Sequence, residues 1–325
     1  LGQEIGAENV VGIARSPEKI ATPGIETRAG DYEIGKDWIA ALAVLPLVPA
    51  LAIVPGLALI LFLTHHAGLA GYLTALLPAG LLYVITLSAL VVALKRLILP
   101  KMEAGVYPVE SAFYLRKWLV DKLAETSLLF NQGMYATLYL PPFLRLLGAK
   151  IGARAEISTV SNITPDLLEI GEETFLADQV SIGAARVHHG LVTLQPVRVG
   201  ARAFIGNAAA LPVGATVPDG SLIGVLSTPP RQTMAAGSAW VGLPSFFLSR
   251  RQIVEGFSET DTYRPSRRQV AMRYAYELLR IILPAALSFG AVAVILHAQD
   301  WLDDTYDLPI VLALLPLVSI AVVVA

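Results

Sequence analysis

Apolar residues recur at every sixth position along the central part of this 325-residue chain. The spacing matches neither the 3.6-residue period of an α-helix nor the alternation of a half-buried strand, so it indicates an internal repeat. Glycine follows six of these positions, and glycine lets the backbone turn where a side chain would clash. The apolar positions are Ile151, Ile157, Ile163, Ile170, Leu176, Ile182, Val199, Ile205, Leu211, Val217 and Ile223.

The repeat predicts a β-solenoid over residues 151–230, with about four coils. One short strand and one turn cannot bury an apolar side alone, but stacked coils line up such side chains in an interior column. A β-sandwich is the alternative fold for this stretch. The pattern resembles that of the hexapeptide-repeat acyltransferases. This resemblance implies an all-β left-handed parallel β-helix with three hexapeptides in each coil.

Two uncharged segments precede the repeat, at residues 39–64 and 72–94. Each is long enough to cross a bilayer core of about 30 Å, so we expect a transmembrane helix pair over residues 39–94. A second, truncated transmembrane helix pair is expected over residues 278–325. Composition agrees, because only 15% of the residues are charged, whereas about a quarter is usual in soluble domains. The predicted fold class is therefore a β-helix domain combined with transmembrane α-helices.

The placement of basic residues predicts the topology. All lysines and arginines lie within residues 1–38 and 95–280, and the loops at 64–71 and 298–307 carry none. By the positive-inside rule, a cytoplasmic linker at residues 1–38 and the β-helix face the cytoplasm. We therefore expect a multi-pass protein of the bacterial cytoplasmic (inner) membrane, in contact with the lipid bilayer. A net charge of -2 and a pI near 6.2 predict no nucleic-acid partner.

Two connecting segments flank the β-helix. Residues 101–150 mix apolar and charged positions, as in amphipathic helices that lie along a membrane surface. Ordinary helices packed onto the end of the β-helix are the alternative. Residues 231–277 form a cytoplasmic connector, whose arginines would lie near anionic lipid headgroups or serve only to fix the topology.

The step of six is interrupted between Ile182 and Val199, so an extra loop, GAARVHHGLVTLQP, must leave the solenoid wall. In the hexapeptide acyltransferases a loop extruded at a comparable place carries the catalytic histidine, which implies that role for His188 or His189. Imidazole titrates near neutral pH and can take a proton from an attacking amine or hydroxyl. The residue after each histidine is not the proline common in the sugar acetyltransferases.

Two further polar residues are candidates for this site. Asp178 could orient the imidazole, and Asn207 could bind a substrate carbonyl. A turn cap is the alternative for Asp178, and a solenoid corner is the alternative for Asn207. The chain has no cysteine, which excludes disulfides, thiolate metal sites and a cysteine nucleophile. No metal site is predicted.

The phrases FIGNAAALPVGATVPDGSLIGVLSTPP and SAWVGLPSFFLSRRQ, with membrane segments on both sides, resemble the C-terminal membrane region of ε-poly-L-lysine synthetase-type non-ribosomal peptide synthetases. The resemblance covers about residues 39–325. It implies upstream adenylation and carrier domains, further tandem membrane and β-helix repeats, and an oligomer-like arrangement of solenoids. This segment would bind no cofactor itself. A carrier domain would deliver a phosphopantetheine-linked aminoacyl thioester, and an amino acid acceptor would attack it repeatedly.

Two other functions stay open at the level of the sequence. The chain would act as a membrane-bound acetyltransferase if its acyl donor were acetyl-CoA. It would act as a non-catalytic β-helix scaffold if the solenoid only organised neighbouring domains.

Overall fold

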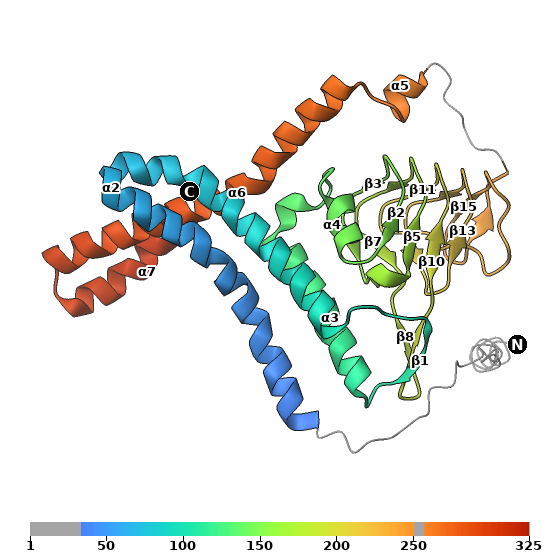
Figure 1. Cartoon of the computed structure of the whole chain (residues 1–325), viewed down its shortest axis with the longest axis horizontal. Coiled ribbons are helices and arrows are strands. Elements are labelled where there is room, and N and C mark those ends of the chain that lie inside the picture. The colour runs from blue at the N-terminus through green and yellow to red at the C-terminus, as the bar shows by residue number, and fades with distance from the viewer. Residues whose placement is uncertain (1–33, 250–256, 325) are drawn as a thin grey trace, which may run out of the picture.

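The computed structural model describes residues 34–249 and 257–324. Residues 1–33 of the predicted linker lie outside these ranges. Arg250 and Arg251 of the predicted connector lie outside them as well. Figure 1 shows the repeat region as a stack of short strands beside a group of long helices.

The repeat folds as a β-helix-type stack of parallel sheets. The first sheet has the order β13-β10-β5-β2, and the second has the order β16-β15-β14-β11-β6-β3, in which only β16 is antiparallel. A third sheet has the order β12-β7-β4. The strands are β2 (Lys150–Ile151), β3 (Glu156–Ile157), β4 (Val160–Ser161), β5 (Leu168–Ile170), β6 (Phe175–Leu176), β7 (Val180–Ile182), β10 (Val197–Val199), β11 (Phe204–Ile205), β12 (Ala210–Leu211), β13 (Thr216–Val217), β14 (Leu222–Ile223), β15 (Ala239–Val241) and β16 (Phe246–Phe247).

The six-residue anchors lie opposite one another in successive coils. Ile170 pairs with Ile151 on one side and with Val199 on the other. Leu176 and Ile205 pair in the next sheet, and neither is exposed. Gly171 has no room for a side chain, because a Cβ there would lie 2.3 Å from the backbone nitrogen of Ala201. The apolar column thus explains the period of six.

One predicted anchor, Ile163, lies outside the strands. Val160, three residues earlier, is buried and pairs with Val180. The chain turns at Asn162, which has a φ of 58°, and then forms the short 3₁₀ helix η2 (Pro165–Leu167). Ile163 is only partly buried against the core.

A long helical hairpin precedes the solenoid. Helix α2 (Ile34–Ile98) is interrupted at Ala67 and Gly68, and Gly68 has a φ of 54°. Figure 1 shows that the chain reverses direction there. Ile60 then packs against Ala75 and Ala79 in one buried cluster.

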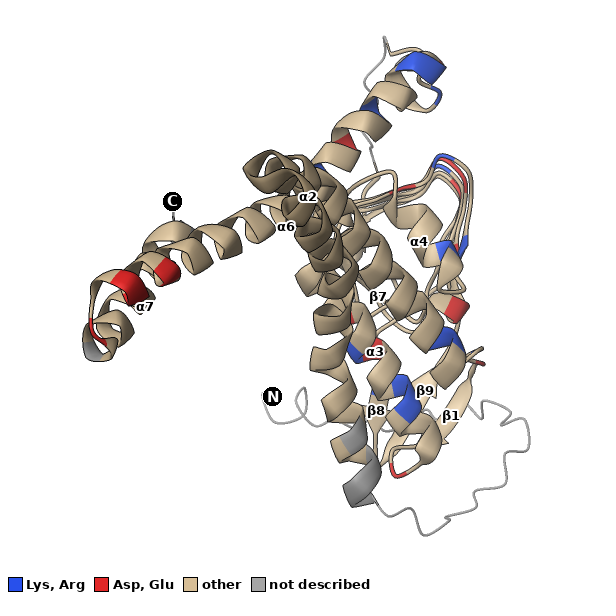
Figure 2. Cartoon of the chain, turned by 60° about the vertical axis from the view of Figure 1, so that its left-hand side comes forward, with Lys and Arg blue, Asp and Glu red and all other residues tan. Residues whose placement is uncertain are grey.

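The chain returns to these helices after the solenoid. The short α5 (Glu259–Thr262) is followed by α6 (Arg267–Thr305) and α7 (Leu308–Val324), and α6 contacts both α2 and α7. Among the described residues, the apolar part of α2 and α6 are each long and apolar enough to cross a membrane. In Figure 2 the middle of these helices is nearly free of charged residues, which gather on the solenoid and at the helix ends.

Helix α3 (Ala112–Phe130) lies between the α2 hairpin and the solenoid (Figure 1). Leu123 is fully buried in the core that it shares with α2 and the solenoid, and Leu115 and Leu119 pack against residues of α2. After the 3₁₀ helix η1 (Gln132–Met134), α4 (Leu140–Leu146) contacts β2 and β3 at the first coil. These contacts are those of helices packed on the β-helix, and whether α3 also lies along a membrane surface stays a prediction.

The buried carboxylate of Glu173 joins a corner of the solenoid to the segment that follows the solenoid. The side chain of Glu173 is 1% exposed and forms ion pairs with Arg154, Arg202 and Arg264. Arg264 lies two residues after the end of α5, and Arg202 also pairs with Glu259 of α5 at 3.0 Å. The hydrogen bonds from these arginines, above all from Arg154, lower the pKa of Glu173 from 4.5 to about 2.

We expect Glu173 to make the stability of this corner depend on acidity. Its folded-state pKa lies below the unfolded value, so its contribution is fully present above about pH 4.5 and is lost as the pH falls through about 2. Glu173→Gln should therefore unfold earlier than the wild type at neutral pH, and the gap should narrow toward pH 2. Denaturant midpoints measured across this range test the expectation. A gap that stays constant with pH would contradict it, and Glu110→Gln, at an exposed carboxylate, is the control.

Candidate functional site

The insertion that carries the two histidines forms a β-hairpin outside the solenoid wall. Strands β8 (Arg186–His188) and β9 (Leu191–Leu194) pair in antiparallel fashion, and β9 also pairs with β1 (Gly105–Pro108). The turn contains only His189 and Gly190, with φ values of 47° and 72°. Two positive φ angles are typical of the tight turns that match the twist of a hairpin. The extra loop thus leaves the wall as predicted, whereas no pattern in the sequence indicates its pairing with β1.

The two faces of this hairpin have different surroundings. Val192 pairs with Val187 and Tyr107, so these three side chains share one face. Val192 is fully buried in a cluster with Val120 of α3. Because side chains alternate along a strand, His188 lies on the opposite, outer face.

The histidines are accessible. Both are exposed, and their rings lie 3.9 Å apart between centroids. An outward-facing imidazole can meet a substrate that arrives from outside the chain, such as a group on a mobile arm.

The other two predicted site residues lie together at a different place, a corner of the solenoid. Asp178 Oδ1 accepts hydrogen bonds from the backbone nitrogen of Thr159 at 3.3 Å and from its hydroxyl at 3.1 Å. The backbone nitrogen of Asp178 donates to Asn207 Oδ1 at 3.2 Å. In the part of the chain that the structure describes, no hydrogen bond or ion pair joins either residue to His188 or His189. These contacts are the ones expected of turn and corner residues.

A groove of about 460 Å³ lies between α3, the start of the hairpin and the solenoid edge near β4. The hairpin contributes apolar side chains, whereas α3 and the solenoid edge contribute both apolar and polar ones. Its lining includes Lys117, Asp121, Ala124, Glu125, Leu128, Val160, Ser161, Asn162, Ile163, Ala184, Ala185 and Val187.

A lysine-aspartate pair occupies the α3 side of this groove. Lys117 is 4% exposed and donates to Asp121 Oδ2 at 2.5 Å. Burial raises the pKa of Asp121 above its usual range, against the opposing effect of the Lys117 ammonium. The sequence places these residues in a helix that either lies along the membrane surface or packs on the β-helix, and it does not single them out. Their i,i+4 spacing is a signal for an ion pair, but it does not say that the pair is buried beside a cavity.

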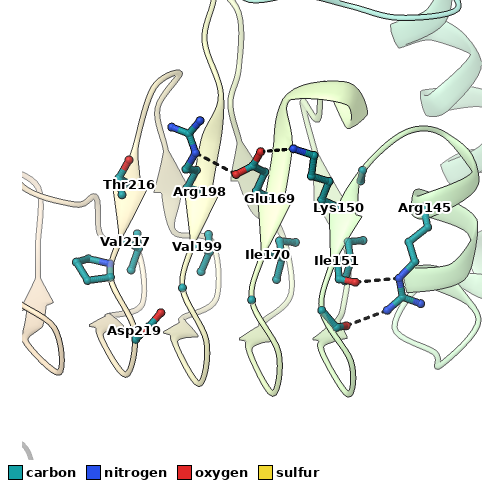
Figure 3. A pocket seen from close by; sticks show the side chains of 15 residues that line it. Arg145, Lys150, Ile151, Glu169, Ile170, Arg198, Val199, Thr216, Val217 and Asp219 are labelled. Atoms are coloured by element: carbon teal, nitrogen blue, oxygen red, sulfur yellow. Dashed lines mark hydrogen bonds and ion pairs between the residues drawn. The ribbon is translucent and has the colours of Figure 1, made fainter.

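A second, open depression of about 760 Å³ follows the outer side of the first sheet. Figure 3 shows a ladder of charges across it, in which Glu169 bonds to Lys150 at 2.8 Å and to Arg198 at 3.0 Å. Arg145 donates to the backbone oxygens of Ile151 and Gly152. The charged side chains that line this surface are therefore satisfied by one another or by the backbone, as Asp219 is by the backbone nitrogen of Ala201. No cluster of metal-ligating side chains occurs among the residues that the structure describes.

Comparison with known proteins identifies one curated relative, and no protein-family model matches the chain. The relative is the delta-poly-L-ornithine synthetase of Acinetobacter baumannii (strain AB307-0294), which is 36% identical over 266 residues. The match covers 80% of this chain and 20% of the synthetase, so the chain spans about a fifth of the length of that relative. The resemblance to poly-amino-acid synthetases that the sequence predicts is thereby confirmed.

Two solved structures align with part of the chain at low TM-scores. A galactoside acetyltransferase in complex with coenzyme A aligns with a TM-score of 0.34 and 15% identity, over 45% of this chain and 86% of that one. The N-acyltransferase AntD from Bacillus cereus, in complex with dTDP and 3-hydroxybutyryl-CoA, aligns with a TM-score of 0.23 and 14% identity, over 44% and 97% of the two chains.

Proposed function

We propose that this relative of a poly-L-ornithine synthetase is the membrane-bound, acyltransferase-type part of a non-ribosomal poly-amino-acid synthetase. It would form amide bonds iteratively, by aminolysis of an aminoacyl thioester that a phosphopantetheine carrier domain presents. The observation that carries this proposal is the 36% identity to the synthetase, which extends through most of the chain. The outward-facing histidine hairpin supports it, because a tethered thioester must approach from outside.

The reaction requires removal of two protons from the acceptor. An ammonium group loses one proton to become a nucleophilic amine, and the amine attacks the thioester carbonyl. The C–N bond forms as the C–S bond breaks. The thiolate that leaves takes up a proton, and the second nitrogen proton passes to a base. We assign the base to one histidine of the pair at 188 and 189, since imidazole is half-protonated near neutral pH.

The same proposal covers the surroundings of the chain. We place it in the bacterial inner membrane with the β-helix in the cytoplasm, because the basic segments and the loops without lysine or arginine follow the positive-inside rule. Its partners would be upstream carrier and adenylation domains and further β-helix repeats. We also propose the left-handed sense for the coils, which the resemblance to the hexapeptide-repeat acyltransferases implies. Asp178 and Asn207 keep their proposed roles beside the substrate only if the substrate bridges the corner and the hairpin.

A two-donor assay tests the proposed function. The purified chain in detergent is given either an ornithyl thioester on a carrier protein or acetyl-CoA, each with free L-ornithine, and products are read by mass spectrometry. Peptide formed only from the carrier thioester is the expected result. Acetylated ornithine formed instead would support the acetyltransferase function. No product from either donor, with the carrier domain supplied in excess, would favour the scaffold.

A further inference from the structure

The groove beside α3 contains a buried charge pair whose hydrogen-bonding capacity is only partly used. The Lys117 ammonium has three donors, and Asp121 Oδ2 is its one acceptor within the described ranges. Oδ1 of Asp121 has no hydrogen-bond partner in the same ranges. A spare donor and a spare acceptor thus lie next to each other in a cavity.

The side chains around the pair do not complete its hydrogen bonds. Lys117 is 4% exposed, and buried charges are costly unless their hydrogen bonds are satisfied. The neighbouring Glu125 also lines the groove, but its Oε2 accepts from Lys122 at 2.6 Å, and within the described ranges it forms no hydrogen bond or ion pair with Lys117. A ligand with both a positive and a negative group would complete these hydrogen bonds, with its positive group beside Asp121 and its negative group beside Lys117.

The rest of the lining narrows the chemistry of that ligand. Across the groove, Asn162 uses its amide nitrogen to bond Ser181 at 3.0 Å, so its amide oxygen is available as a second acceptor for an ammonium group. Leu128, Val160 and Ile163 line the groove as well and suit an aliphatic chain. The groove therefore offers acceptors for an ammonium, donors for a carboxylate and an apolar wall.

The geometry points to the α3 groove as a binding site for a zwitterionic α-amino acid, with Asp121 on its ammonium and Lys117 on its carboxylate. The site lies on the inner side of the hairpin whose outer face carries His188. Naming the bound amino acid as the acceptor of amide formation rests on the proposed function. The binding site itself does not.

Equilibrium binding of three small molecules to the full chain in detergent tests this inference without any thioester. L-ornithine carries both groups, putrescine lacks the carboxylate, and 5-aminopentanoate lacks the α-ammonium. We expect L-ornithine to bind at least about tenfold more tightly than either analogue, because each lost charge-assisted hydrogen bond costs about that much. Equal binding of all three, or no saturable binding of L-ornithine, would overturn the inference.

Variants then assign the two charges. Lys117→Met should bind L-ornithine no better than putrescine, and Asp121→Asn should bind it no better than 5-aminopentanoate.

Ala184→Phe fills the exposed mouth of the groove without touching either charge, so it tests the site even if the charge variants fail to fold. Glu110→Gln should bind like the wild type. Unchanged binding in Ala184→Phe would place the ligand elsewhere. Binding without peptide synthesis would retain the site and reject only the proposed function.

Discussion

Replacing both hairpin histidines, as His188→Ala with His189→Ala, should lower the rate of amide formation from a carrier-bound thioester by about 10²- to 10⁴-fold. This is the range by which a positioned acid-base group accelerates proton transfer. Both rings are exposed on the hairpin and contact each other. Their removal should therefore leave the fold intact, and the loss should lie in turnover. Single-turnover rates with preloaded thioester measure it.

The chain supplies a matched control for this change. His65 and His66 are also adjacent, and they lie near the break in α2, where His66 contacts the backbone oxygen of Phe62 at 2.8 Å. Replacing both with alanine should leave the rate unchanged. The single variants His188→Ala and His189→Ala should divide the effect unequally, since one imidazole holds the proton. Full activity in the hairpin double variant would reject the assignment of the base.

The position of the hairpin illustrates what the sequence reveals and what it does not. The broken step of six between Ile182 and Val199 predicts an excursion at this point. The face that each histidine occupies depends on the pairing of β9 with β1, a strand more than eighty residues earlier in the chain. Nothing in the local pattern specifies that register, because a shift of one residue would exchange the two faces.

The same distinction applies to the solenoid and the groove. The anchors that pair within sheets were predictable because each coil repeats the same burial. Ile163 does not join this pairing, because the chain turns at Asn162 directly before it. The groove could not be predicted, because its lining comes from α3, a solenoid turn and the hairpin. Lys117 and Asp121 looked like surface residues in sequence, and only the packing of α3 buries the lysine.

A buried ion pair between distant segments should have the largest effect on stability. Lys95, in the last turn of α2, is 2% exposed and pairs with Asp166 at 2.7 Å. Asp166 also accepts a hydrogen bond from the backbone nitrogen of Met102 at 3.1 Å, and Lys95 donates to the backbone oxygen of Pro100 at 3.1 Å. These contacts join the end of the helical hairpin to η2 in the first coil.

Lys95→Met should lower the free energy of unfolding by about 3–5 kcal/mol, because it leaves a carboxylate without its partner in a buried site. The double variant Lys95→Met with Asp166→Asn should recover most of that loss, since the amide still accepts from Met102 and no unpaired charge stays buried. Denaturant unfolding in detergent, followed by tryptophan fluorescence, compares the three proteins.

Lys101→Met is the control, because its ion pair with Glu103 is exposed and should contribute less than about 1 kcal/mol. A double variant as unstable as Lys95→Met would show that the pair is held by its packing and not by its charge. Recovery would show that the attachment of the membrane hairpin to the solenoid depends on matched charges, which the sequence places 71 residues apart.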